Sequence, residues 1–278
     1  MARPDYIDAL IDDVGQYAEL VARAVEIGTG KATLAFASRG IAVTYLESHA
    51  RIAALLATKG IVYSHVSVEV EPFATWIPTE SYDLLVAPLK WHWVNPIRRW
   101  DLAYAARRDG GALALFWNRF ALASLEAQSK LFEGDRRFGV HIMEPSTSPH
   151  PSSDFSEDVD VADGWPAFDL RTDARFGHFV KQRYRRTLSF NVSTFRDLLA
   201  SLSAYRLLET VEQERLFDEI RSLFKTASVI KLAVATQLFV GRTVEPSFCT
   251  PGPLSGQPAP PVRPRLTLLL RIALLNPY

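Results

Sequence analysis

The sequence predicts an α/β protein with a doubly wound, mostly parallel sheet of seven strands and helices on both faces. Two observations predict this fold class. Short apolar segments typical of strands alternate with helical segments, and a glycine turn joins the first strand to the helix that follows it. The composition agrees with a globular chain, because 48% of the 278 residues are hydrophobic and 22% are charged.

The first 117 residues supply five strands and the helices between them. Apolar residues recur at helical spacing from residue 6 to residue 17. Strands are expected at residues 22–27, 41–46, 66–70, 82–87 and 112–117, and further helices at residues 32–39, 48–59 and 96–107. Because strands that alternate with helices pair in parallel, we expect helices to cover both faces of the sheet.

The rest of the domain adds two strands and an insertion. Residues 121–178 begin with an expected helix at residues 122–132 and continue into a stretch rich in Pro, Ser and Asp, which predicts an inserted lid or substrate cover. Residues 1–242 therefore form one domain, and the Pro-rich residues 243–278 are expected to be a disordered tail. The further strands are expected at residues 183–191 and 229–240, with helices at residues 194–202 and 212–224.

Charge and cysteine content narrow the range of partners. The chain holds 31 Lys and Arg against 31 Asp and Glu, so it lacks the positive field that concentrates nucleic acid or anionic membrane around a protein. A local basic run is interpreted as a charged strand edge, although a nucleic-acid contact stays open there. The single cysteine, Cys249, rules out a disulfide framework within the chain and a Cys-rich zinc site, and no metal is expected. The basic run consists of Lys181, Arg183, Arg185 and Arg186.

We expect no targeting segment in this sequence. Residues 1–14 carry acids where a signal peptide needs an uninterrupted apolar segment. The longest late apolar run, residues 266–275, is interrupted by Arg271 and is shorter than the ~20 residues that span a bilayer. We therefore expect a cytoplasmic protein that makes no contact with a membrane.

The first candidate site is the glycine turn after the first strand. Glu26 lies near the end of that strand, and Gly28, Thr29 and Gly30 lead into the next helix. Glycines let the backbone turn tightly and approach a ligand, and the amino end of a helix offers free N–H groups. The turn fits a nucleotide-like cofactor, and a purely structural turn is the alternative. A Walker phosphate loop is excluded, because the lysine after the turn is followed by alanine.

A carboxylate follows the second expected strand. Glu47 lies 19 residues beyond Gly28. Nucleotide-binding α/β proteins place an acid about 20 residues beyond the glycine turn, where its two oxygens bind the vicinal ribose hydroxyls. Taken alone, Glu47 also fits a polar residue at the end of a strand. In combination with the glycine turn it favours a nucleoside site.

The third candidate site follows the strand at residues 82–87. Trp91, His92 and Trp93 belong to the edge where doubly wound sheets bind ligands. A histidine side chain ordinarily titrates near neutral pH, so His92 can serve as a base, and the indole rings can pack against adenine or a sulfonium cation. The alternative is structural, with the tryptophans covering the sheet and His92 forming a hydrogen bond.

The order of these segments resembles that of the class I S-adenosylmethionine-dependent methyltransferases, in their broad small-molecule branch. The resemblance rests on residues 24–39 (AVEIGTGKATLAFASR), 82–96 (YDLLVAPLKWHWVNP) and 109–118 (DGGALALFWN), together with the leading residues 3–10. It covers about residues 3–242. The resemblance implies a Rossmann-like fold, S-adenosyl-L-methionine as the cofactor, and methyl transfer to a small-molecule acceptor.

The resemblance also implies roles for individual residues. Residues of the turn shape the methionine end of the site, Glu47 binds the ribose, residues after the third strand border adenine, and residues after the fourth strand face the transferred methyl group. His92 is the candidate base. The cofactor-binding set is Glu26, Gly28, Thr29, Gly30, Glu47, Phe73, Ala74, Leu89 and Trp91, and the substrate set is Tyr6, Trp93 and Trp117.

The glycine turn departs from the pattern of this family. The family carries acid-x-Gly-x-Gly-x-Gly, whereas only Gly28 and Gly30 follow Glu26 here, so the turn is two residues short. A shorter turn draws the helix toward the strand and narrows the space for the methionine moiety. The alternative function is therefore a catalytically impaired methyltransferase-like binding protein that has lost cofactor binding. A nicotinamide-dependent oxidoreductase is a third hypothesis, although its three-glycine fingerprint is absent too.

Overall fold

The computed structural model describes residues 5–28, 30–60, 62–88, 91, 94–96, 98–140 and 173–244. Contacts divide the chain into two units, Met1–Glu245 and Pro246–Tyr278. The second unit lies outside the described residues, and so do residues 141–172 of the expected lid. The substrate cover and the disordered tail therefore stay predictions.

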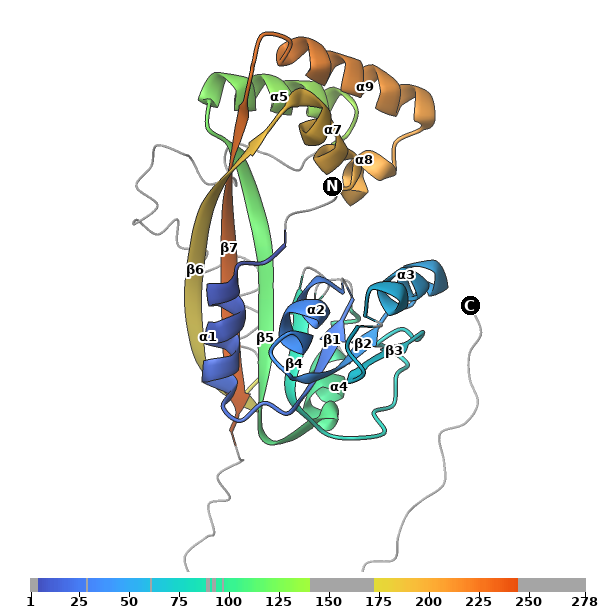
Figure 1. Ribbon diagram of the computed structural model, residues 1–278, viewed down its shortest axis with the longest axis vertical. Coiled ribbons are helices and arrows are strands. Elements are labelled where there is room, and N and C mark those ends of the chain that lie inside the picture. The colour runs from blue at the N-terminus through green and yellow to red at the C-terminus, as the bar shows by residue number, and fades with distance from the viewer. Residues whose placement is uncertain are drawn as a thin grey trace, which may run out of the picture. The chain divides into compact units, whose positions relative to one another are not determined.

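The described strands form one sheet (Figure 1). They are β1 (Arg23–Ile27), β2 (Ala42–Leu46), β3 (Val66–Glu69), β4 (Tyr82–Pro88), β5 (Arg107–Leu122), β6 (Phe176–Phe190) and β7 (Ile230–Thr243). Their order is β3-β2-β1-β4-β5-β7-β6. Four of the six neighbouring pairs are parallel, and β7 runs antiparallel to both β5 and β6. The doubly wound, mostly parallel fold class predicted from the sequence is confirmed.

Helices cover both faces of the parallel strands. Leu84 and Val86 of β4 share a buried cluster with α1 and α2, whereas Leu85 and Ala87 share another with α4. Successive strand residues point to opposite faces, so β4 is buried from both sides. None of the described helices is long and apolar enough to cross a bilayer. The helices are α1 (Asp8–Ala18), α2 (Lys31–Ala37), α3 (Ala50–Gly60), α4 (Arg99–Ala106), α5 (Leu125–Arg137), α7 (Val192–Ala200), α8 (Ser203–Arg206) and α9 (Thr210–Leu223).

The strands β5, β6 and β7 form a long antiparallel group that carries a helical end, made of α5, α7, α8 and α9 (Figure 1). These strands have 14 to 16 residues, against four to seven in the parallel strands. Apolar side chains of the helical end and of the strand ends form a separate buried cluster. Ser124 and Asn191 cap α5 and α7 by accepting hydrogen bonds from the backbone N of Ala127 (3.2 Å) and Thr194 (2.8 Å).

The long strands exceed the lengths that the sequence predicted. The strand expected at residues 112–117 is the middle of β5, and the strand expected at residues 183–191 is the second half of β6. Residues 107–111 carry charge and glycine and show no strand pattern of their own. Arg107 nevertheless pairs with Tyr82 of β4, and residues 112–122 pair with β7. Pairing with partner strands overrides the weak local preference.

Candidate functional site

The candidate site lies where the strand order reverses. The strands β1 and β4 are neighbours in the sheet, but the chain leaves them toward opposite sides. Open α/β sheets bind ligands in the crevice outside the carboxyl ends of their strands at such a point. The glycine turn follows β1 and Glu47 follows β2, so the structure brings these two predicted features to one edge. Thr29, Leu89, His92 and Trp93, also predicted for this edge, lie outside the described residues.

The glycine turn is tight, and its acid is buried. Gly28 (φ 96°) and Gly30 (φ 69°) have positive φ values, which residues with a side chain rarely adopt. Glu26 has no exposed surface, and its Oε2 accepts hydrogen bonds from the backbone N (2.5 Å) and Oγ1 (2.6 Å) of Thr33. The carboxylate thereby satisfies an N–H group in the first turn of α2 and places negative charge near the positive end of that helix.

Among the described residues, three donors hold the side chain of Glu47. The residue is 5% exposed. Tyr45 Oη donates to Oε2 at 3.0 Å, whereas the backbone N of His49 (3.0 Å) and Oγ of Ser48 (3.3 Å) donate to Oε1. These hydrogen bonds stabilise the charged carboxylate and fix its orientation after β2. A carboxylate has about four lone-pair sites, so Glu47 retains acceptor capacity for a ligand hydroxyl.

Phe73 and Ala74 follow β3 beside the cluster that contains α4. Phe73 is buried, and its ring centroid lies 6.0 Å from that of Trp76. The indole N–H of Trp76 donates to Glu69 Oε2 at 2.7 Å, which ties this segment to the end of β3. Ala74 is half-buried. Phe73 is thus part of the core beside the candidate site, and the contact of Phe73 and Ala74 with adenine stays a prediction.

Trp91 lies in the interior after β4. Its ring meets the ring of Trp100 edge-on, with centroids 5.1 Å apart. The Arg99 guanidinium lies 5.4 Å from the centre of the Trp91 ring, and its Nη1 donates to the Trp91 carbonyl at 3.2 Å. Arg99 therefore anchors α4 to the segment after β4. Sequence reasoning missed Arg99 because an arginine in a helical pattern is ordinarily expected to face solvent. A cofactor contact of Trp91 stays a prediction.

Tyr6 and Trp117, both predicted to contact substrate, pack on opposite faces of β5. Tyr6 meets Phe116 edge-on, with ring centroids 4.6 Å apart. Trp117 stacks on Phe239 at 5.2 Å, and its indole N–H donates to Gln237 Oε1 at 3.1 Å. Phe116 and Trp117 are consecutive strand residues and therefore point to opposite faces. The structure does not bring Tyr6 and Trp117 together on one face, and their substrate roles stay predictions.

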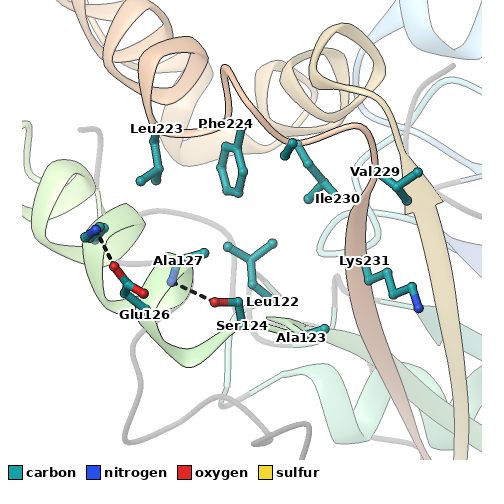
Figure 2. A pocket seen from close by; sticks show the side chains of 12 residues that line it. Leu122, Ala123, Ser124, Glu126, Ala127, Leu223, Phe224, Val229, Ile230 and Lys231 are labelled. Atoms are coloured by element: carbon teal, nitrogen blue, oxygen red, sulfur yellow. Dashed lines mark hydrogen bonds and ion pairs between the residues drawn. The ribbon is translucent and has the colours of Figure 1, made fainter.

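A cavity of about 510 Å³ lies in the helical end, between the start of α5 and the segment that joins α9 to β7 (Figure 2). Figure 2 shows Leu122 and Phe224 facing each other across it. The ion pair between Glu126 and Lys130 (2.5 Å) borders one side. The cavity has a size that suits a small molecule. None of the residues predicted for the cofactor or the substrate lines it.

The order and directions of the strands give this chain the Rossmann-like α/β fold of the class I S-adenosylmethionine-dependent methyltransferases, as the sequence predicted. The chain is similar to a proposed type II methyltransferase from Anaeromyxobacter dehalogenans, with a TM-score of 0.56, 18% identity, and coverage of 86% of this chain and 97% of that chain. It is also similar to YcgJ from Bacillus subtilis, with a TM-score of 0.50, 12% identity, and coverage of 86% and 97%. At these identities the likeness concerns the fold. No protein-family model and no curated protein matches the sequence.

Proposed function

We propose that the protein transfers a methyl group from S-adenosylmethionine to a small-molecule acceptor. The observation that carries the proposal is the convergence of the glycine turn and Glu47 at the point where the strand order reverses. The antiparallel β7 between β5 and β6 supports methyl transfer over the nicotinamide-dependent hypothesis, because dinucleotide-binding sheets have the order 3-2-1-4-5-6.

The chain's own residues would bind and align the reactants. S-adenosylmethionine supplies an electrophilic methyl group when bound, so no reactive side chain is required. Glu47 fits a nucleoside because its carboxylate is oriented by its donors and retains acceptor capacity for ribose hydroxyls. Phe73 and Trp91 would exclude water from the site, which strengthens the remaining polar contacts. His92 would accept a proton from the acceptor or orient it.

Calorimetric titration with S-adenosylhomocysteine tests the proposal. We expect saturable binding to the wild-type protein and about tenfold weaker binding to Glu47→Gln, because the amide loses the charge and one acceptor oxygen. Glu80→Gln is the matched control, since Glu80 pairs with Arg23 at the opposite, amino-terminal edge of the sheet and should leave the affinity unchanged. NAD should not compete. Equal affinities of the Glu47→Gln and wild-type proteins would contradict the role of Glu47.

A specific observation favours a second candidate function, a catalytically impaired methyltransferase-like binding protein. Both acids of the site already accept hydrogen bonds from the chain, Glu26 from Thr33 and Glu47 from Tyr45. A ligand must compete with these internal donors, and the shortened turn narrows the space that it would enter. A folded wild-type protein that gives no heat with millimolar S-adenosylhomocysteine would support this candidate and contradict the first.

A further inference from the structure

A tyrosine side chain fills the space between the glycine turn and Glu47. Tyr45 of β2 has no exposed surface. A Cβ atom added to Gly30 would lie 3.3 Å from Tyr45 Cζ and 2.9 Å from Leu56 Cδ2 of α3. The Tyr45 ring and the Leu56 side chain therefore leave no room for a Cβ atom beside the turn.

The Tyr45 hydroxyl occupies one oxygen of the Glu47 carboxylate. It donates to Oε2 at 3.0 Å and, within the part of the chain that the structure describes, it is the only donor to that oxygen, since Ser48 and His49 donate to Oε1. Burial raises the pKa of Tyr45, and the carboxylates of Glu47 and Glu26 raise it further. The hydroxyl therefore remains protonated, and remains a donor, at neutral pH.

We propose that Tyr45 is a positioning residue that lowers the affinity of this edge for a nucleoside, because its hydroxyl competes with the ribose hydroxyls for Oε2 of Glu47. This proposal rests on the proposed function, which assigns Glu47 to the ribose. Vicinal hydroxyls bind a carboxylate through both of its oxygens, so one of them has to approach Oε2, where the Tyr45 hydroxyl already donates. The two donors compete for the position on this oxygen, and a Tyr45 hydroxyl that is pushed aside stays buried without its acceptor, a cost that the ligand has to offset.

Two nucleosides distinguish this competition from a packing effect. Adenosine carries the vicinal hydroxyls, and 2′,3′-dideoxyadenosine lacks them. In calorimetric titrations, Tyr45→Phe should bind adenosine about threefold to tenfold more tightly than the wild-type protein, the range expected for one net hydrogen bond. Its affinity for 2′,3′-dideoxyadenosine should not change. Tyr82→Phe is the matched control, because Tyr82 is also buried but its hydroxyl donates to Thr44 Oγ1 (3.2 Å) and not to Glu47.

Several outcomes would overturn the proposal. An equal gain for both nucleosides would indicate loosened packing, and an unchanged or lower affinity of Tyr45→Phe for adenosine would show that Tyr45 does not compete. If the wild-type protein binds S-adenosylhomocysteine and Tyr45→Phe has no effect, the role of Tyr45 is wrong and the proposed function stands. If the wild-type protein does not bind S-adenosylhomocysteine but Tyr45→Phe binds adenosine through its hydroxyls, the proposed function fails and the role of Tyr45 stands. Absence of binding to every folded variant contradicts both.

A measurement without ligand tests the contact itself. The free energy of unfolding in urea is compared for Tyr45→Phe, Glu47→Gln and the double variant. We expect the double variant to lose less stability than the sum of the single variants, because both changes remove the same hydrogen bond. Strictly additive losses would overturn the proposal whatever the nucleosides show.

Discussion

Two regions of the molecule bury carboxylates in different ways. At the carboxyl edge of the parallel strands, Glu26 and Glu47 each accept two or more hydrogen bonds from the chain. In the helical end, Asp135 of α5 has no exposed surface and accepts one hydrogen bond, from Tyr205 Oη at 2.7 Å. Its Oδ1 has no hydrogen-bond partner among the described residues. Burial raises the pKa of Asp135 to about 7, and the Tyr205 hydrogen bond opposes this rise only in part.

The difference separates the candidate ligand edge from a structural core. Donors around Glu47 stabilise a charged acceptor at the point where doubly wound sheets bind ligands. The apolar cluster around Asp135 favours the neutral acid instead. Burial of a carboxylate therefore does not mark a site by itself. The donors that surround the carboxylate, and its place in the strand order, distinguish the candidate site from the buried carboxylate of the core.

The largest effect is expected from removing a carboxylate at the parallel edge. Glu26→Ala leaves the backbone N–H and the hydroxyl of Thr33 without this acceptor in a buried place, and the free energy of unfolding should fall by about 4 kcal/mol. Glu26→Gln keeps one acceptor oxygen, so its free energy of unfolding should fall clearly less than that of Glu26→Ala. Urea unfolding followed by circular dichroism measures both. Equal losses in the two variants would contradict the importance of the hydrogen bonds to Thr33.

The helical end should lose stability as the pH rises. The folded pKa of Asp135 is about 7, above the ~3.9 of an unfolded aspartate, so the folded state holds this proton more tightly. The resulting stabilisation is complete below pH ~4 and is lost, by about 4 kcal/mol in total, as the pH rises through about 7. Asp135→Asn does not titrate. The difference in unfolding free energy between wild type and variant should change by that amount, and parallel pH profiles would contradict this account.

A smaller effect is expected at two glycines with similar backbone angles. Gly30 (φ 69°) and Gly40 (φ 80°) both lie in the left-handed region. A Cβ atom on Gly40 would meet nothing within 4 Å. The free energy of unfolding of Gly40→Ala should therefore fall only by the backbone strain, about 1 kcal/mol. Gly30→Ala should cost about 2 kcal/mol more, because the methyl group overlaps Leu56 and Tyr45. Urea unfolding measures both variants, and a similar loss of unfolding free energy in Gly30→Ala and Gly40→Ala would show that side chains do not close the turn.

Local patterns were sufficient to predict the elements of the parallel half. From Arg23 to Ala37 the chain forms an apolar strand, a glycine turn and a helix. Each of these elements is recognisable from the types of a few neighbouring residues. No local sequence pattern of this kind predicts the full length of β5. Residues 107–111 become part of a strand only because β4 lies beside Arg107, and a single sequence does not show that long-range pairing.

The sequence predicted that the glycine turn and Glu47 lie at one edge of the sheet, but it did not predict the contacts that these residues make. Glu47 follows from its spacing to the glycine turn, because the fold fixes that distance along the chain. The role of Tyr45 was not predictable, since a tyrosine in an apolar strand fits the core equally well. Its partner Leu56 comes from α3, and only the folded structure places it beside Gly30. The hydrogen bond from Thr33 to Glu26 likewise depends on how closely α2 follows β1.

Hydrogen–deuterium exchange with and without S-adenosylhomocysteine tests the central claim, that the carboxyl edge of the parallel strands binds the adenosyl group. We expect slower exchange in peptides that cover the glycine turn and Glu47, residues 23–48, at saturating ligand. Exchange in α5 and α9, which border the cavity of the helical end, should be unchanged. Slower exchange confined to the helical end, or no change anywhere with millimolar ligand, would contradict the claim.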